Sequence, residues 1–387
     1  MKTLDALLLP AGPELLDRRA ELAKILDGTN AYVPVPDDPQ AAELLIGALG
    51  VGDPIDDDIS LVISTSGTTG IPKGAQHTPT TLSASAQATS LHLGGPGNWL
   101  LALAPHHIAG LQVLLRALAA GFTPAVLDVR DGFDPDAFAD ALDALDGPRR
   151  YTSLVPTQLI KVLDSPRATA ALAGADALLV GGAATPVPLL HKAIDASVPI
   201  IRTYGMSETA GGCVYDGIPL DGVVIDIEDA NPDGVGRVRL GGPMVAYGYR
   251  NLPDHPAFAD PGWFRTDDLG RVDKHGVLSI IGRADEAISS GGLTIVPQVV
   301  EAVIIDDPAV AECAVVGLPD DRLGEKVVAF VVPSGTRRVD AERIKAGVIE
   351  RLDRYAAPRE VIEIDQLPTR GPGKVDRRAL RNRFGPA

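Results

Sequence analysis

One short segment combines hydroxyl groups, glycines and a lysine in a way that suits the binding of a phosphate chain. It reads Ser-Thr-Ser-Gly-Thr-Thr-Gly-Ile-Pro-Lys-Gly over residues 64–74 and follows the apolar run Leu61–Ile63. Glycines leave backbone N–H groups open to an anion, hydroxyls are further donors, and Lys73 adds a positive charge. The segment is not a Walker A loop, which ends in Gly-Lys-Ser/Thr. The alternative interpretation is an ordinary surface turn.

The composition indicates a soluble globular protein with more than one domain. The chain has 387 residues, too many for one ordinary core, with 45% apolar and 22% charged residues. Its formal net charge is −16 and no basic patch stands out, which argues against nucleic acid as a partner. A local cationic site can still bind an anion against this overall charge.

The cysteines and the termini predict a cytoplasmic protein. Cys213 and Cys313 lie far apart and show no zinc-binding spacing, so we expect free thiols in a reducing compartment. The N-terminus lacks a signal-peptide pattern, and no apolar run reaches the roughly 18 residues that a membrane helix needs. We therefore expect no membrane insertion. The oligomeric state is left open, with a homodimer as one option.

Short apolar runs alternate with helix-like segments from residue 59 to residue 202. This alternation predicts an α/β fold in which parallel sheets are covered by helices, with ligands beyond the C-terminal ends of the strands. The phosphate segment occupies such a position. We expect strands at 61–63, 99–103, 124–127, 153–155, 178–180 and 199–202, and helices near 79–91, 109–119, 134–145, 157–163 and 186–194.

The pattern changes twice in the second half of the chain. Glycines and alternating residues over 219–281 predict a small antiparallel β-rich part. After Gly282 the pattern predicts a compact α+β unit with helices near 297–305 and 339–353 and strands at 311–316, 325–332 and 361–365. The expected organisation is a large N-terminal domain over 1–282 and a small, mobile C-terminal domain over 283–387.

Four further motifs follow the phosphate segment in a fixed order. They are Tyr204–Glu208, Trp263–Asp268, Gly282–Asp285 and Pro368–Lys374. Together the five motifs resemble the signature set of the adenylate-forming superfamily, which includes acyl-CoA synthetases, adenylation domains of peptide synthetases and luciferases. The resemblance covers residues 60–380. It implies an enzyme that converts a carboxylate and ATP into an acyl-AMP and pyrophosphate, and then passes the acyl group to a thiol.

Weaker markers resemble one branch of that superfamily, the o-succinylbenzoate–CoA ligases of menaquinone biosynthesis in their short actinobacterial type. The markers are residues 105–110, 153–158, 178–184 and 212–217, together with the short stretch before the phosphate segment. This resemblance implies coenzyme A as the thiol and o-succinylbenzoate as the acid. Two alternatives are a ligase for another aryl or short-chain acid, and an ATP- or AMP-binding protein that has lost catalysis.

The superfamily resemblance implies which residues bind the nucleotide. The phosphate segment would hold the phosphates and the departing pyrophosphate, Tyr204 would stack on adenine, and Asp268 with Arg283 would bind the ribose. The usual pattern has glycine where this chain has Asp267, which places a negative charge near the phosphates. The full nucleotide set is Thr65, Ser66, Gly67, Thr68, Thr69, Gly70, Lys73, Gly182, Ala183, Ala184, Tyr204, Gly205, Met206, Ser207, Asp268 and Arg283.

Three residues are implied in catalysis. Lys374 would bridge the attacking carboxylate and the α-phosphate, and Glu208 would bind Mg²⁺, which prefers one or two carboxylates beside phosphate oxygens. His107 would line the acyl pocket. The alternatives are an exposed lysine, a carboxylate at a helix start, and a structural histidine.

Two more roles follow from the resemblance. Asp285 would be the hinge about which the small domain turns, although Ser289 stands where the superfamily often has lysine. The second carboxylate of o-succinylbenzoate needs a cationic or hydrogen-bonding partner, for which the candidates are Arg202, Thr157 and Gln158. Arg202 could equally be paired with a nearby aspartate.

Overall fold

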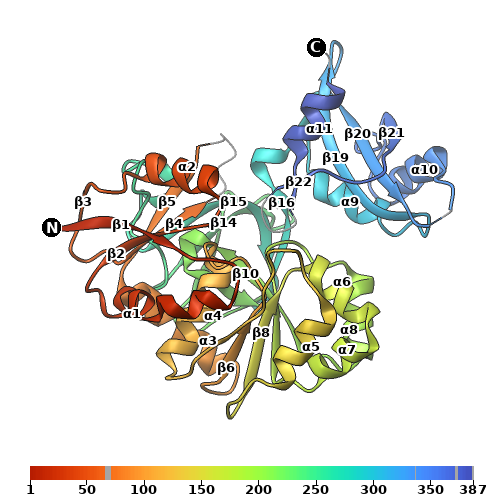
Figure 1. Ribbon diagram of the computed structural model, residues 1–387. Helices are drawn as coiled ribbons and strands as arrows, with labels where there is room; N and C mark the ends of the chain where they lie inside the picture. Colours follow the sequence, from red (N-terminus) through yellow and green to blue (C-terminus); the bar gives the residue numbers. More distant parts are fainter. Residues whose placement is uncertain (66–70, 336, 371–373, 386–387) are drawn as a thin grey trace. The chain divides into compact units, whose positions relative to one another are not determined.

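The computed structural model describes residues 1–65, 71–335, 337–370 and 374–385 (Figure 1). The chain divides into two compact units. The first contains Met1–Asp226, Arg239–Arg265 and Lys274–Leu278, and the second contains Ile227–Val238, Thr266–Asp273 and Ser279–Ala387. The boundary that we expect at residues 282/283 stays a prediction. Within the described residues, no helix is long and apolar enough to cross a membrane.

A seven-stranded sheet forms one half of the first unit. Its spatial order is β12-β11-β10-β9-β8-β6-β7, and the five strands from β10 to β7 are parallel, whereas β11 and β12 are antiparallel. The sheet confirms the predicted parallel arrangement. The strands are β6 (Asn98–Leu101), β7 (Ala125–Val126), β8 (Arg150–Leu154), β9 (Ala177–Val180), β10 (Ile200–Met206), β11 (Gly211–Tyr215) and β12 (Ile218–Pro219).

Helices cover both faces of this sheet (Figure 1). The helices α5 (Pro135–Asp143), α6 (Pro156–Asp164), α7 (Pro166–Ala173) and α8 (Val187–Asp195) pack on one face, where Phe138, Leu159 and Leu172 are fully buried against the strands. The helices α3 (Pro79–His92) and α4 (Ile108–Ala119) cover the other face. A capping box between Thr78 and Thr81 begins α3, so this helix starts directly after β5.

A five-stranded sheet of order β3-β1-β2-β4-β5 forms the other half of the first unit. Its core consists of aliphatic residues from β1, β2 and β4 packed against α2. The strands are β1 (Lys2–Leu8), β2 (Ala31–Val35), β3 (Pro54–Ile55), β4 (Leu61–Thr65) and β5 (Lys73–His77), accompanied by η1 (Pro13–Arg18), α1 (Arg19–Asp27) and α2 (Pro39–Leu49). Because β4 and β5 are antiparallel neighbours, the phosphate segment connects the two strands of a hairpin.

A four-stranded sheet of order β13-β14-β15-β16 accounts for the predicted β-rich part. Its strands are β13 (Val224–Glu228), β14 (Gly236–Gly241), β15 (Trp263–Val272) and β16 (Leu278–Arg283), and the short helix η3 (Pro256–Phe258) precedes β15. The motif Trp263–Asp268 therefore lies within a strand.

The second unit contains the predicted α+β fold. Its sheet has the order β18-β17-β20-β19, with β21 pairing to β20. The helices α9 and α10 pack on one face of the sheet and α11 on the other, because alternate residues of β19 face opposite sides. The elements are η4 (Ala284–Glu286), β17 (Ile288–Ser290), β18 (Leu293–Ile295), α9 (Pro297–Ile304), β19 (Val310–Asp320), β20 (Gly324–Pro333), α10 (Ala341–Arg351), β21 (Glu360–Glu363), β22 (Thr369–Arg370), β23 (Lys374–Val375) and α11 (Arg377–Phe384).

Both cysteines are free thiols, as the sequence predicts. Cys213 lies in β11 with 2% of its surface exposed, and burial raises the pKa of its thiol to about 12. Cys313 lies in β19, where burial and the neighbouring charge of Glu301 raise the pKa of its thiol as well. Neither thiol is therefore ionised near neutral pH.

Candidate active site

The hairpin of β4 and β5 places the two ends of the phosphate segment side by side. Ser64 is opposite Gly74 and Thr65 is opposite Lys73 in the antiparallel register. Thr65 ends β4 and Lys73 begins β5, so both are fixed by strand pairing. The predicted phosphate-binding residues 66–70 lie outside the described residues, and their role stays a prediction.

The turn after β10 lies against this hairpin. The strand continues into the short helix η2 (Ser207–Thr209), which carries Ser207 and Glu208 of the second motif. The Ser207 hydroxyl donates a hydrogen bond to the carbonyl oxygen of Ser64 at 3.1 Å. Nε2 of His77 lies 2.7 Å from the Ser207 carbonyl oxygen. The structure therefore brings two predicted nucleotide-binding segments together, although 143 residues separate Ser64 from Ser207.

Glu208 is a buried carboxylate at the centre of this turn, with 7% of its surface exposed. The Tyr249 hydroxyl donates a hydrogen bond to its Oε1 at 2.5 Å. The Lys73 ammonium nitrogen lies 4.7 Å from the centroid of the same tyrosine ring, a distance that gives a cation–π interaction. One aromatic side chain thus contacts both the predicted metal ligand and the cation of the phosphate segment.

The residues present suit Mg²⁺ bound together with a nucleotide. Mg²⁺ usually takes one or two carboxylates and completes its octahedron with phosphate oxygens and water. Glu208 supplies one carboxylate beside the hairpin of β4 and β5, called the phosphate hairpin below because it carries the ends of the phosphate segment. In the part of the chain that the structure describes, no cluster of three or more His, Cys, Asp or Glu residues could bind a metal by itself. The chemistry of this single ligand therefore fits a metal that arrives with ATP.

Tyr249 reaches Glu208 because its segment runs along β5. Backbone hydrogen bonds join Tyr247 N to Gln76 O at 2.8 Å, Gln76 N to Gly248 O at 2.9 Å and Arg250 N to Gly74 O at 2.7 Å. A β-bridge pairs Ala75 with Tyr249. The segment lies within residues 219–281, for which the sequence predicted a β-rich part and no chemistry.

The end of the turn is fixed by buried side chains. Ala210 adopts the left-handed conformation (φ 52°), which is strained for a residue with a Cβ atom. Its carbonyl oxygen accepts hydrogen bonds from Ser85 Oγ at 3.1 Å and from Gln112 Nε2 at 2.7 Å. Gly205 is required here by β11, because a Cβ atom at this position would lie 2.1 Å from the Gly211 carbonyl oxygen.

The predicted adenine-side residues lie at one edge of the seven-stranded sheet. Val180 at the end of β9 pairs with Arg202 of the parallel strand β10. The segment Gly182–Ala184, which follows β9, is exposed, and Tyr204 to Met206 continue β10 and are half-buried. Parallel neighbours end at the same edge of a sheet, so both segments begin from this edge. Their contact with adenine stays a prediction.

The residues predicted to bind the acid substrate either contact other groups of the protein or lie on the surface. Arg202 Nε forms an ion pair with Asp216 Oδ1 at 2.8 Å, and both side chains are about half exposed. Gln158 donates from Nε2 to the Ala102 carbonyl oxygen at 2.7 Å and accepts at Oε1 from Val155 N at 3.1 Å. Thr157 is exposed at the start of α6. The structure thus shows the aspartate partner of Arg202 that the sequence left open.

His107 occupies the N-cap position of α4, and its ring centroid lies 4.2 Å from that of His106. Burial lowers the pKa of His106 to about 4, with a smaller contribution from the charge of His107. His106 is therefore neutral near pH 7. The role of His107 in the acyl pocket stays a prediction.

The predicted ribose residues form an ion-pair cluster within the second unit. Arg283 Nη1 lies 3.3 Å from Asp268 Oδ1, and its Nε and Nη2 each donate to one oxygen of Asp285 at 2.8 Å. Asp267 Oδ2 lies 3.6 Å from Arg283 Nη2, and its Oδ1 lies 3.3 Å from Arg237 Nη1. Burial opposes the charge of Arg283, but the Asp285 hydrogen bonds and the three carboxylates outweigh it and raise its pKa. Asp267 thus has cationic partners.

Lys374 begins β23, where its backbone pairs with Arg370 of β22, while its side chain lies outside the description. Three residues further on, Arg377 lies between two carboxylates that are mostly buried. Its Nη2 contacts both oxygens of Glu301 at 2.7 and 2.8 Å, and its Nη1 lies 3.1 Å from Glu286 Oε2. This pairing joins the first residue of α11 to α9 and to η4, the helix of the predicted hinge Asp285.

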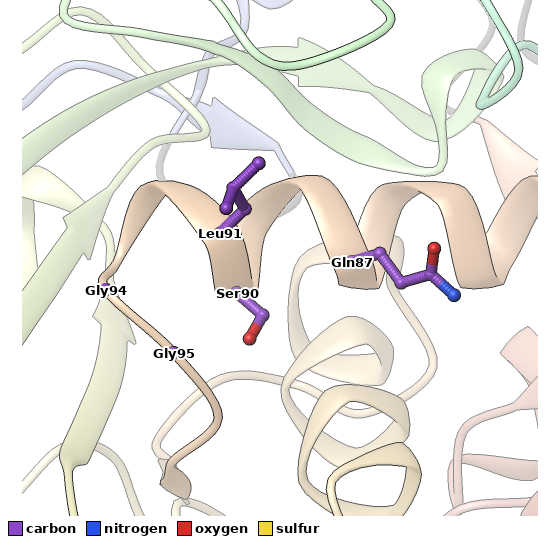
Figure 2. Close-up of a pocket in the computed structure, with 5 residues that line it drawn as sticks. All are labelled: Gln87, Ser90, Leu91, Gly94 and Gly95. Atoms are coloured by element: carbon purple, nitrogen blue, oxygen red, sulfur yellow. The ribbon is translucent and has the colours of Figure 1, made fainter.

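A shallow pocket lies elsewhere in the first unit, at the end of α3 (Figure 2). Gln87, Ser90 and Leu91 line it from the helix, and Gly94 and Gly95 line it from the following turn. None of these side chains is charged, and none belongs to the predicted site. These five residues therefore supply no charged side chain for a polyphosphate.

Comparisons with known proteins identify the family of the chain. The family model of AMP-binding enzymes matches residues 14–250, and that of their C-terminal domain matches residues 299–374. A probable 2-succinylbenzoate–CoA ligase from Mycobacterium tuberculosis (strain ATCC 25618 / H37Rv) is 52% identical over 383 residues, 98% of each chain. A feruloyl-CoA synthase from Amycolatopsis sp is 34% identical over 85% of this chain and 70% of that protein.

Solved structures share the fold over the whole chain. The o-succinylbenzoate CoA synthetase from Bacillus subtilis, in complex with its acyl-adenylate intermediate, matches with a TM-score of 0.81 and 26% identity, over 100% of this chain and 88% of that one. ATP-bound MatB from Rhodopseudomonas palustris matches in fold with a TM-score of 0.84 at 23% identity, over 99% of this chain and 89% of that one. The predicted combination of a large and a small domain is thereby confirmed. By sequence and by fold, the chain belongs to the family of AMP-binding enzymes.

Proposed function

We propose that the protein is an ATP-dependent ligase that activates 2-succinylbenzoate as an acyl-AMP and transfers the acyl group to coenzyme A. The observation that supports 2-succinylbenzoate as the acid substrate is the 52% identity to the mycobacterial 2-succinylbenzoate–CoA ligase over 98% of both chains. The observation that supports the chemistry is the arrangement of Lys73, Ser207 and Glu208 around the phosphate hairpin. We place the reaction, and with it a role in menaquinone biosynthesis, in the cytoplasm.

In the first half-reaction the acid carboxylate attacks the α-phosphorus, and pyrophosphate leaves. Lys73 and the hairpin that carries it bind the β- and γ-phosphates, and the Ser207 hydroxyl donates to the α-phosphate. Glu208 would hold Mg²⁺, which would supply neutralisation of phosphate charge as pyrophosphate departs. Asp268, with Arg283 beside it, accepts hydrogen bonds from the two ribose hydroxyls. These bonds fix the sugar and thereby orient the α-phosphate.

In the second half-reaction the thiol of coenzyme A attacks the acyl carbon and expels AMP. We propose that Lys374 serves only the first half-reaction, by binding the carboxylate and the α-phosphate as charge develops. The small domain, which carries Lys374, then turns about Asp285 to admit the thiol. The pair of hydrogen bonds from the Arg283 guanidinium to the Asp285 carboxylate is the contact that would rearrange at this hinge.

The variant Lys374→Ala tests whether Lys374 acts in the first half-reaction only. Loss of the ammonium should slow formation of acyl-AMP by a factor of about 10² to 10³, as for other groups that stabilise developing charge. Conversion of pre-made acyl-AMP by coenzyme A should stay within about threefold of the wild type. Rapid-quench assays of each half-reaction measure this, and an equal loss of both would contradict the assigned role.

A second acid remains a specific alternative, because the feruloyl-CoA synthase is as similar to this chain as the Bacillus cereus 2-succinylbenzoate–CoA ligase, at 34% identity each. A pyrophosphate-release assay should compare 2-succinylbenzoate, ferulate, benzoate and a short fatty acid at equal concentration. We expect kcat/KM to be at least about tenfold higher with 2-succinylbenzoate, since a site that pairs a second carboxylate rejects acids that lack it. A higher value with ferulate would reject the acid but keep the reaction class.

A further inference from the structure

His77 is a buried side chain that joins the phosphate hairpin to the turn carrying Ser207 and Glu208. It ends β5 and has none of its surface exposed. Nε2 lies 2.7 Å from the Ser207 carbonyl oxygen, and Nδ1 lies 3.1 Å from Thr81 Oγ1. No motif of the sequence singles it out, and the mechanism above does not use it.

The partners of His77 determine where its proton lies. A carbonyl oxygen can only accept, so Nε2 must carry the hydrogen that it shares with Ser207. In the neutral ring Nδ1 is then an acceptor that faces the Thr81 hydroxyl at 3.1 Å, and the hydrogen of this hydroxyl also has the Thr78 carbonyl oxygen within reach at 2.9 Å. Burial lowers the pKa of His77 to about 4, against the Ser207 hydrogen bond that raises it, so the ring is neutral near pH 7. His77 therefore acts as a fixed, uncharged donor.

We propose that His77 is a positioning residue: its Nε2–H anchors the Ser207 carbonyl and so holds the Ser207 hydroxyl and the Glu208 carboxylate at the phosphate hairpin. The opposite side of the turn is held by Ala246 N, which donates to the Glu208 carbonyl oxygen at 2.8 Å. Side chains that orient a metal ligand typically change metal affinity or activity 10- to 100-fold when removed. The inference rests on the proposed nucleotide and metal roles of Ser207 and Glu208.

The geometry offers a matched pair of variants. In His77→Gln the amide nitrogen replaces Nε2 and can still donate to Ser207, whereas in His77→Asn the shorter amide can reach the Thr81 side only. Both variants remove the ring and leave a neutral amide. If anchoring matters, we expect Gln to retain ATP affinity in the presence of Mg²⁺ within about threefold and Asn to lose it by about tenfold or more.

The measurement is calorimetric titration of ATP with and without Mg²⁺, with no acid present. Thermal unfolding of each variant serves as the check on folding. Equal losses for Gln and Asn, or losses that follow the melting temperature alone, would overturn the proposal in favour of simple packing. Because no acid enters the titration, the result does not depend on which acid the enzyme activates.

A second pair covers the case in which His77→Asn does not fold. Thr81 is half-buried and accessible to substitution. Thr81→Ser keeps the hydroxyl beside Nδ1 of His77 and in the capping box of α3, and Thr81→Val removes it from both at nearly constant volume. We expect Val to weaken Mg²⁺-dependent ATP binding several-fold and Ser to leave it within twofold, relative to the wild type. Identical binding by Val and Ser would count against the anchoring role.

Discussion

At the scale of single residues, Tyr249 is the point where opposite charges of the site meet. Its hydroxyl donates to Glu208, and its ring contacts the Lys73 ammonium. The ring itself is held edge-on by His255 and Phe258, with centroid distances of 4.9 and 5.0 Å. A rigid ring can therefore present its hydroxyl to the carboxylate without an entropic cost at the moment of nucleotide binding.

Tyr249→Phe isolates the hydroxyl from the ring. The variant keeps the aromatic packing and the face offered to Lys73, but Glu208 loses a donor, and a hydrogen bond to a charged group is worth about 1.5–3 kcal/mol. We expect a rise of about tenfold or more in the Mg²⁺ concentration at half-maximal pyrophosphate release. Tyr247→Phe, two residues earlier with a 76% exposed side chain, is the control and should change this value less than twofold. Equal behaviour of the two variants would disprove the role.

The sequence predicted some members of the site and missed others for a physical reason. Ser207 and Glu208 lie in the contiguous motif Tyr204–Glu208, which was predicted to bind the nucleotide and Mg²⁺. His77 and Tyr249 acquire their roles only through pairing of β5 with the segment after Ala246, and such long-range contacts leave no local pattern.

At the scale of elements, the mostly buried pairing of Arg377 with Glu286 and Glu301 connects α11 to η4 and to α9. Their side chains are 14%, 14% and 15% exposed. Burial raises the pKa of Glu301, and the charge of Arg377 works against that rise. The arginine therefore stabilises two carboxylates that would otherwise be costly within the fold.

Arg377→Met should be much more damaging than the same change at the next residue. Removing one partner of a buried ion pair leaves an uncompensated charge and costs about 3–5 kcal/mol. Arg378 is exposed, so Arg378→Met should change the free energy of unfolding by less than about 0.5 kcal/mol. Hydrogen exchange of α9 and α11 measures local stability in both variants. Similar protection of these helices in Arg377→Met and the wild type would contradict the expectation.

The elements themselves show what local sequence can predict. The strands and helices between residues 59 and 202 were predictable because apolar runs and amphipathic segments alternate there. The helix α7 was missed because only Ser165 separates it from α6. The helix α11 was missed because its sequence is rich in arginine and buries only Leu380, so its formation depends on the Asp376 cap and on packing against β19 and β20.

At the scale of the whole molecule, buried neutral histidines make stability depend on pH. The pKa of His77 falls from an ordinary value of 6.5 to about 4 on folding, mainly through burial. Below pH 6.5 the unfolded chain binds a proton that the folded chain does not, so the free energy of unfolding decreases as the pH falls from 6.5 towards 4. His106 contributes in the same direction.

The contribution of His77 to the pH dependence of stability can be measured by comparing the wild type with His77→Gln. Between pH 7.5 and 5, the wild type should lose about 2 kcal/mol more of its unfolding free energy than His77→Gln, because the glutamine does not titrate. Urea unfolding followed by tryptophan fluorescence is suitable, since Trp99 and Trp263 both belong to the first unit, as does His77. The same pH dependence in both proteins would show that His77 is already charged when folded.

The protonated state of both cysteines makes this enzyme a convenient starting point for fluorescence labelling. Because Cys213 and Cys313 are free but disfavoured as thiolates, thiol-reactive dyes should modify the folded wild type slowly. One engineered cysteine in each unit, for example at the exposed positions Leu91 and Ile349, would then be the preferred attachment sites without removal of the native thiols. Energy transfer between two dyes placed there would test, in real time, the proposed turning of the small domain between the half-reactions.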